Sequence, residues 1–298
     1  MSNTFEHTLS DGTKVRLPVE RLSYSALSLY LRCPMQYYFR YVEGHKEPPA
    51  AAMVTGTAGH TALEQNNLHK IKTGEDLPEK TVLDTFSDSL VVLAKDVEDW
   101  SGDSLDTLNT QGRGVLAEYV KSAAPLLQPV HAERSIDFTV SGIPFVARID
   151  LENADGTVLD YKVVGKRSSY LNKGAAETSL QLALYGVAAE SEKAGFCALV
   201  KDTQKVCFTP TRSITPGVLT ELDVVVTNVV KAISAGAFPL CDEGNWWCSE
   251  KWCGYHHRCR GAMAAGTYPA PIKKASPMPR VITGIKVSAT KAPPRRKA

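Results

Sequence analysis

The chain has 298 residues, 43% of them hydrophobic, so it can bury a sizeable core, and its length is compatible with one domain or two. No run approaches the roughly 18 consecutive apolar residues of a membrane span. The first residues also lack the basic and apolar regions of a signal peptide, which predicts a cytoplasmic protein without membrane contact. Seven cysteines in such a chain argue against a disulfide framework and for free thiols or metal ligation.

The charge is unevenly distributed along the chain. The formal net charge is +2, yet the stretch from Pro271 to the end holds eight basic residues and no acidic one, which leaves the rest at −6. Any nucleic-acid path over this acidic body must therefore be a local groove. Residues 263–298 are predicted to form a basic disordered tail that is attracted to phosphate, with a solubilising extension as the alternative.

Apolar periodicity and turn signals predict an α/β core after an N-terminal extension of residues 1–19. Pro34 restarts a helix at the first-turn position that proline tolerates. The expected helices cover residues 24–31, 35–42, 54–71, 82–100, 105–124, 177–192 and 216–235. The expected strands cover residues 132–140, 143–151, 157–164, 197–200 and 206–209.

A predicted hairpin over residues 148–162 carries the most informative pattern. Asp160 and Lys162 share one face of a strand because side chains alternate. A three-residue loop at 154–156, with Gly156 in the left-handed conformation, places Asp150 opposite Asp160, whereas a two- or four-residue loop separates them. Two carboxylates and a lysine are what metal-assisted attack of water on a phosphodiester requires. The alternative is a surface hairpin with ordinary charges.

Four motifs stand in order along the chain: Gly56 to His60, then Asp150, then Asp160 to Lys162, then Gln181 to Tyr185. Together they resemble the RecB-like branch of the PD-(D/E)XK nuclease superfamily, whose signature is G-x-x-x-H, D, D-x-K and Q-x-x-x-Y. The resemblance covers residues 20–262. The chain is similar in particular to the iron–sulfur members found among phage exonucleases and CRISPR-adaptation nucleases.

The resemblance implies a restriction-endonuclease-like core over residues 20–262: a mixed central β-sheet flanked by helices, with helical additions closed by a Cys cluster. It implies a metal-dependent DNA nuclease, expected to be an exonuclease on single strands, in DNA recombination, repair or phage DNA processing. A phage-encoded protein would work in the host cytoplasm, and a recombination or helicase protein is the expected partner. The alternative is a catalytically inactive nuclease-fold DNA-binding subunit of a larger complex, although none of the expected active-site residues is missing.

The resemblance also implies roles for single residues. Asp150 and Asp160 would ligate Mg²⁺ or Mn²⁺, with the main-chain carbonyl of Tyr161 and the side chain of His60 completing the protein ligands. An imidazole ligand favours Mn²⁺. Lys162 would orient the attacking water or stabilise charge on the pentacovalent phosphate. The alternative for His60 is an ordinary helix histidine.

Gln181 and Tyr185, one helical turn apart, would hold the substrate strand or the metal-site geometry, or else form a structural helix pair. Glu133 on the first strand of the hairpin region could face the site as a further acid, but it is not included in the predicted set. Lys166 and Arg167, just after the D-x-K motif, could meet a phosphate of the cleaved strand or form a solvated turn.

The cysteines form the second constellation. Cys248, Cys253 and Cys259 lie close together in sequence within segment 241–262, and Cys33 lies far upstream. By resemblance these four thiolates hold a [4Fe–4S] cluster, which would tie together parts of the chain more than two hundred residues apart. The family more often closes with C-x2-C-x5-C, so the first gap here is longer.

Other assignments of the cysteines stay open. Zinc could be held by Cys248, Cys253, Cys259 and either His256 or His257, or the thiols could be unligated. Cys241 is a reserve ligand. Cys197 and Cys207 stand in apolar strand contexts and are expected in the core.

Overall fold

The structure is a computed structural model, and it describes residues 4–98, 100, 102–165, 171–172 and 174–268. The chain divides into two compact units, Met1–Tyr255 and His256–Ala298. The second unit contains the 3₁₀ turn η5 (His256–Arg258) and helix α8 (Arg260–Ala264). Residues 269–298, most of the predicted basic tail, lie outside the described residues, as do Lys166 and Arg167.

The first unit is built on a mixed sheet of six strands among the described residues, in the order β3-β4-β5-β6-β7, with β8 also paired to β6. Strands β3, β4 and β5 are antiparallel, β5 and β6 are parallel, and β7 and β8 run antiparallel to β6. This arrangement confirms the predicted mixed α/β fold. The strands are β3 (Pro129–Val140), β4 (Ile143–Asn153), β5 (Thr157–Val164), β6 (Lys193–Val200), β7 (Lys205–Phe208) and β8 (Arg212–Ser213).

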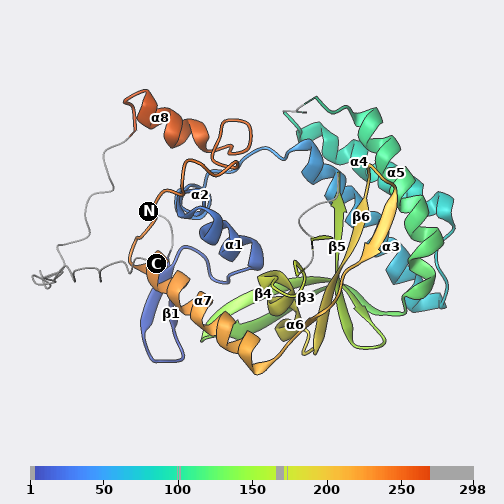
Figure 1. Cartoon of the computed structure of the whole chain (residues 1–298), viewed down its shortest axis with the longest axis horizontal. Coiled ribbons are helices and arrows are strands. Elements are labelled where there is room, and N and C mark those ends of the chain that lie inside the picture. The colour runs from blue at the N-terminus through green and yellow to red at the C-terminus, as the bar shows by residue number, and fades with distance from the viewer. Residues whose placement is uncertain (1–3, 99, 101, 166–170, 173, 269–298) are drawn as a thin grey trace, which may run out of the picture. The chain divides into compact units, whose positions relative to one another are not determined.

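Helices cover both faces of this sheet (Figure 1). On one face lie α3 (Ala51–Thr73), α4 (Glu79–Leu93) and α5 (Leu105–Ser122). On the other face lie α6 (Leu180–Ala188) and α7 (Pro216–Ser234), with α1 (Tyr24–Arg32) packed beside them. The short elements are α2 (Pro34–Tyr37), the π-helical turn η1 (Tyr38–Val42) and the 3₁₀ turns η2 (Ala94–Asp96) and η3 (Ala124–Leu126).

Local capping explains where these helices begin and end. The hydroxyls of Ser23, Ser104, Ser179 and Thr215 each accept a backbone N–H from the first turn of α1, α5, α6 and α7. Helix α3 ends at Gly74, whose φ of 83° is the left-handed conformation that glycine adopts easily. The Ser179 cap begins α6 at Leu180, and the helix ends at Ala188, so it is shorter than the 177–192 expected from periodicity.

The core lies on both sides of the sheet. Leu159 and Tyr161 of β5 point into the layer formed with α3, α4 and α5, where Tyr119 is fully buried. Phe145 of β4 packs into the other layer with residues of α1, α6 and α7. The alternation along β5 therefore leaves Asp160 and Lys162 facing away from Tyr161, as the sequence predicted.

The β4–β5 hairpin has the predicted three-residue loop. Leu151 stands opposite Leu159 and Glu152 opposite Val158, and Gly156 has a φ of 79°. On its other edge β5 pairs with β6 along its whole length. The parting of β4 from β5 opens the sheet where Asp150 and Asp160 lie.

A β-hairpin that the sequence analysis did not predict occupies the expected N-terminal extension. It consists of β1 (Phe5–Thr8) and β2 (Lys14–Leu17), and Val15 and Leu17 are buried in the core. Only two side chains of these short strands are buried, so the apolar alternation is too brief to stand out. Within the described residues, no helix is both long and apolar enough to cross a membrane.

Candidate functional site

A hollow of about 380 Å³ opens between α3, the splayed strands and α6. It contains the residues of all four sequence motifs, which come from elements far apart in the chain. Its lining residues are Gly56, Thr57, His60, Thr61, Glu64, Glu133, Arg148, Asp150, Asp160, Lys162, Gln181 and Tyr185. The parallel crossover from β5 through α6 to β6 brings Gln181 and Tyr185 back to the D-x-K strand.

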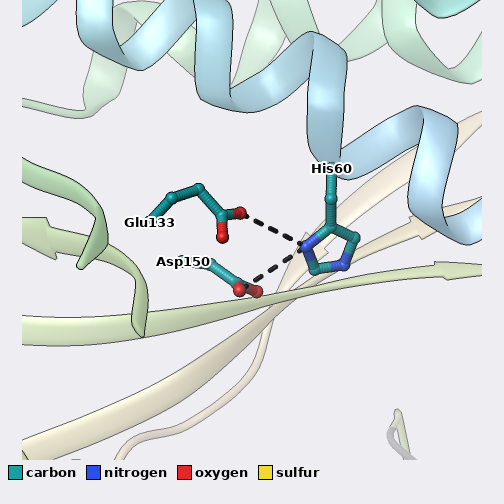
Figure 2. Close-up of side chains that lie close together, drawn as sticks. All are labelled: His60, Glu133 and Asp150. Atoms are coloured by element: carbon teal, nitrogen blue, oxygen red, sulfur yellow. Dashed lines mark ion pairs between the residues drawn. The ribbon is translucent and has the colours of Figure 1, made fainter. Parts of the chain in front are cut away.

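Three side chains in the hollow could hold a metal ion. His60 of α3, Glu133 of β3 and Asp150 of β4 each offer a ligand atom, and these atoms lie within 4.8 Å of one another. The Nδ1 atom of His60 is 3.5 Å from Asp150 Oδ1 and 3.7 Å from Glu133 Oε1 (Figure 2). Two carboxylates and one imidazole make a donor set suited to Mn²⁺, and to Mg²⁺ with more water.

The backbone of β5 fixes the carboxylate of Asp150. The Tyr161 N–H donates to Asp150 Oδ2 at 2.7 Å, and the Asp150 side chain is buried. This bond leaves Oδ1 directed at His60. The ring of Tyr161 points the other way, where its hydroxyl lies 2.8 Å from the Tyr119 hydroxyl and accepts from Asn67 at 3.1 Å.

Asp160, Lys162, Gln181 and Tyr185 form one network. Lys162 Nζ lies 2.7 Å from Asp160 Oδ2 and donates to Gln181 Oε1 at 3.0 Å. The Gln181 amide nitrogen donates to Asp160 Oδ1 at 2.7 Å and reaches the Tyr185 hydroxyl at 3.2 Å. Gln181 therefore bridges the carboxylate and the ammonium group.

Neighbouring carboxylates shift the pKa values of groups in the hollow. Burial and the negative charge of Asp150 raise the pKa of Asp160 to about 7, although Lys162 opposes this. Burial alone would lower the pKa of His60, but its contacts with Asp150 and Glu133 raise it to about 10. Without a metal, the hollow therefore retains protons that a divalent cation would replace.

Glu133 is the residue that the predicted set left out. Its side chain is 7% exposed and it faces His60, on a backbone with a φ of 48°. The signal was present in the β3–β4 turn: a two-residue turn at Ser141 and Gly142 pairs Val140 with Ile143, and that register places Glu133 opposite Asp150. Counting along this hairpin would have found this third candidate metal ligand.

Cysteine side chains form a second group in the first unit. The thiols of Cys33, Cys241, Cys248 and Cys253, here named the thiol cluster, interact with one another. Burial, followed by hydrogen bonds and charge interactions with Cys33 and Cys248, raises the pKa of Cys241 to about 12. The amide of Gln36 donates to the Cys253 sulfur at 3.0 Å. The reserve ligand Cys241 thus belongs to this group.

The other cysteines lie elsewhere. Cys259 is buried in the second unit at the start of α8, so its assignment as a ligand stays a prediction from the sequence. Cys197 is fully buried in the sheet, as expected, whereas Cys207 on β7 is half-buried.

Comparison with known proteins agrees with the fold. The family model of the PD-(D/E)XK nuclease superfamily matches residues 21–260. The chain therefore belongs to the PD-(D/E)XK nuclease superfamily. No curated protein matches the chain.

Solved structures similar to this chain include the following two. A crystal structure from Eubacterium rectale, named "Putative exonuclease", has a TM-score of 0.51 at 12% identity and covers 77% of this chain and 87% of its own. The crystal structure of SSO0001 has a TM-score of 0.33 at 12% identity and covers 76% of this chain and 93% of its own. At this identity, the first structure shows a shared fold.

Proposed function

We propose that the protein is a divalent-metal-dependent deoxyribonuclease that hydrolyses phosphodiester bonds of single-stranded DNA from an end. The observation that carries the proposal is the meeting of the H, D, D-x-K and Q-x-x-x-Y residues with Glu133 in one hollow of a chain from this nuclease superfamily. Removal of nucleotides from ends is supported by the resemblance to phage exonucleases. DNA recombination, repair or phage DNA processing is the proposed setting.

His60, Glu133, Asp150 and Asp160 would hold the metal, with the main-chain carbonyl of Tyr161. The residues fit a cation because three of the side chains are carboxylates and because the ligand atoms of His60, Glu133 and Asp150 lie within 4.8 Å of one another. A bound divalent cation supplies Lewis acidity to the phosphate and lowers the pKa of a coordinated water. The imidazole favours Mn²⁺ over Mg²⁺.

Lys162 supplies the positive charge beside this carboxylate group. Its Nζ is held by Asp160 and Gln181, so the ammonium group is already positioned before DNA arrives. From there it orients the attacking water or stabilises the negative charge that develops on the phosphate. Gln181 keeps Lys162 and Asp160 at their separation, and Tyr185 supports Gln181.

The test is degradation of end-labelled single- and double-stranded DNA by anaerobically purified protein with Mn²⁺, Mg²⁺ or EDTA. Lys162→Ala is compared with Lys205→Ala, which removes an exposed lysine of β7. We expect metal-dependent cleavage that Lys162→Ala abolishes and Lys205→Ala retains. Absence of cleavage by protein carrying its full metal complement would favour an inactive DNA-binding subunit instead.

The same gel tests the preference for ends and strands. A circular single strand should stay intact while a linear strand of the same sequence is degraded, and labels at the 5′ and 3′ ends give the polarity. Cleavage of the circle would replace the exonuclease proposal with an endonuclease. Duplex DNA cut as fast as single strands would remove the proposed strand preference.

We further propose that cysteines hold a [4Fe–4S] cluster. The thiol cluster supports this because three of the four predicted ligands, Cys33, Cys248 and Cys253, interact there. Cys259 remains the predicted fourth ligand, and Cys241 is the alternative. Iron and sulfide analysis of Cys259→Ser and Cys241→Ser protein decides between them, because loss of iron in one variant names the ligand. Zinc in place of iron would contradict the proposal.

A further inference from the structure

We infer that Arg148 is a binding residue for a backbone phosphate of the DNA strand, placed at the mouth of the hollow. This inference deepens the proposed function and rests on it. Arg148 lies on β4 two positions before Asp150, so both side chains leave the same face of the strand. Its side chain is 66% exposed although it lines the hollow.

The inner edge of the Arg148 guanidinium is anchored. Its Nε donates to Glu133 Oε2, and its Nη2 lies 3.9 Å from Glu64 Oε2. The other oxygen of Glu133 faces His60. Two carboxylates therefore hold the planar guanidinium in one orientation, with much of the side chain open to solvent. Much of the entropy cost of ordering this long side chain is met before a ligand binds.

The charges around the hollow explain why such a cation is needed. The lining carries four carboxylates, from Glu64, Glu133, Asp150 and Asp160. Lys162 is only 18% exposed, and its ammonium group already contacts Asp160 and Gln181. Arg148 is thus the most exposed cationic side chain of the described lining, since His60 is 31% exposed and already contacts Glu133 and Asp150. A DNA strand that approaches these carboxylates meets a favourable charge there first.

The geometry of the guanidinium indicates a phosphate as its ligand. Its remaining N–H groups form a fixed fork that matches two oxygens of a phosphate. A phosphate carries no sequence information, so this contact predicts binding without base preference. The phosphate bound would flank the cleaved bond, because Arg148 Nε and His60 Nδ1 contact the same carboxylate.

The test is the binding of fluorescent single-stranded DNA by the full chain, measured by anisotropy in Ca²⁺ over a range of salt concentrations. A gel verifies that the labelled DNA stays intact during the measurement. For Arg148→Ala we expect about a tenfold rise in Kd, the size of one charge-assisted hydrogen bond. We also expect the slope of log K against log salt to fall by about 0.7, which corresponds to one phosphate contact on a single strand.

Two variants control for charge and for folding. Arg21→Ala removes an exposed arginine that pairs with Asp137 at 2.5 Å outside the hollow, and it should leave the salt slope unchanged. Arg148→Lys keeps the charge but loses the fork, so it should retain most of the slope with a weaker Kd. Thermal unfolding shows that each variant is folded.

A second readout separates phosphate binding from a structural role. Removal of a positive charge beside Glu133 should leave Mn²⁺ affinity unchanged or raise it. Arg148→Ala protein that loses Mn²⁺ affinity while its DNA salt slope stays at the wild-type value would overturn the inference in favour of positioning Glu133. Unchanged DNA binding in Arg148→Ala overturns the inference alone, whereas wild-type protein that neither binds nor cleaves DNA overturns the proposed function with it.

Discussion

Glu133 combines a strained backbone with a buried charge. Its φ of 48° lies in the left-handed region, which costs a non-glycine residue on the order of 1–3 kcal/mol. In this conformation the carboxylate faces His60. Strain of this kind is typical of functional sites, because a stable fold tolerates it only where other contacts over-determine the position.

The strain at position 133 predicts a difference between two variants that both remove the charge. Asparagine adopts the left-handed conformation more easily than glutamine, so Glu133→Asn protein should be about 1 kcal/mol more stable than Glu133→Gln protein. Both should lose metal-dependent cleavage. Urea unfolding in EDTA measures the stability, and equal free energies of unfolding would show that the backbone at 133 is not strained.

Asp160 predicts a pH dependence of stability in the absence of metal. Its folded pKa of about 7 lies above the unfolded value of 3.8, so the folded state takes up a proton between these pH values. The stability that this protonation contributes is present below about pH 4 and is lost as pH rises through about 7. Asp160→Asn removes the titration. In EDTA, the variant should gain Tm relative to wild type between pH 5 and pH 8, and parallel Tm curves would contradict this.

At the scale of elements, the β4–β5 hairpin decides whether the two aspartates share the hollow. A loop one residue shorter would turn the D-x-K face of β5 away from Asp150, because side chains alternate. Gly156 permits the three-residue loop, and a Cβ at this position would meet no atom within 4 Å. The requirement for glycine there is therefore purely conformational.

Because an added Cβ would meet no atom, substitution of Gly156 measures only the cost of a left-handed residue. Gly156→Ala should lower the free energy of unfolding by about 1–2 kcal/mol, the cost of a left-handed alanine. Gly56→Ala is the matched control: it also adds a methyl group in open space, but inside helix α3, where alanine stabilises by up to about 1 kcal/mol. If both substitutions change the free energy of unfolding in the same direction, the explanation is wrong.

The elements also show what the sequence could predict. Long periodic segments such as α3 and α7, and the register set by Gly156, follow from local signals, and the structure agrees. The β1–β2 hairpin escaped because its burial depends on distant helices and only two of its side chains carry the pattern. Glu133 was named only as a possible further acid, because its role depends on pairing across strands, which a linear motif does not contain.

At the scale of the whole molecule, the proposed cluster would join the N-terminal helices to the segment after α7. Cys33 and Cys253 are more than two hundred residues apart in sequence and yet interact in the first unit. A ligated cluster that closes so long a loop removes much freedom from the unfolded chain. Its contribution should therefore appear in global stability.

Loss of Cys33 should consequently affect the entire fold. Cys33→Ser protein is expected to lose its iron and to unfold at a lower temperature than wild type, with a smaller effect on metal binding at His60. Cys207→Ser is the control, since this half-buried thiol of β7 lies outside the thiol cluster. Equal Tm and iron content in wild type and Cys33→Ser would exclude Cys33 as a ligand.

The central claim is that the hollow is a metal-dependent hydrolytic site. The most direct test is the rate of degradation of end-labelled single-stranded DNA with saturating Mn²⁺ by wild type and by Asp150→Asn. The asparagine can still accept the Tyr161 N–H, so the fold is kept while a charged ligand is lost. We predict a loss of about a thousandfold or more in rate. Asp150→Asn protein that cleaves at the wild-type rate would contradict the account.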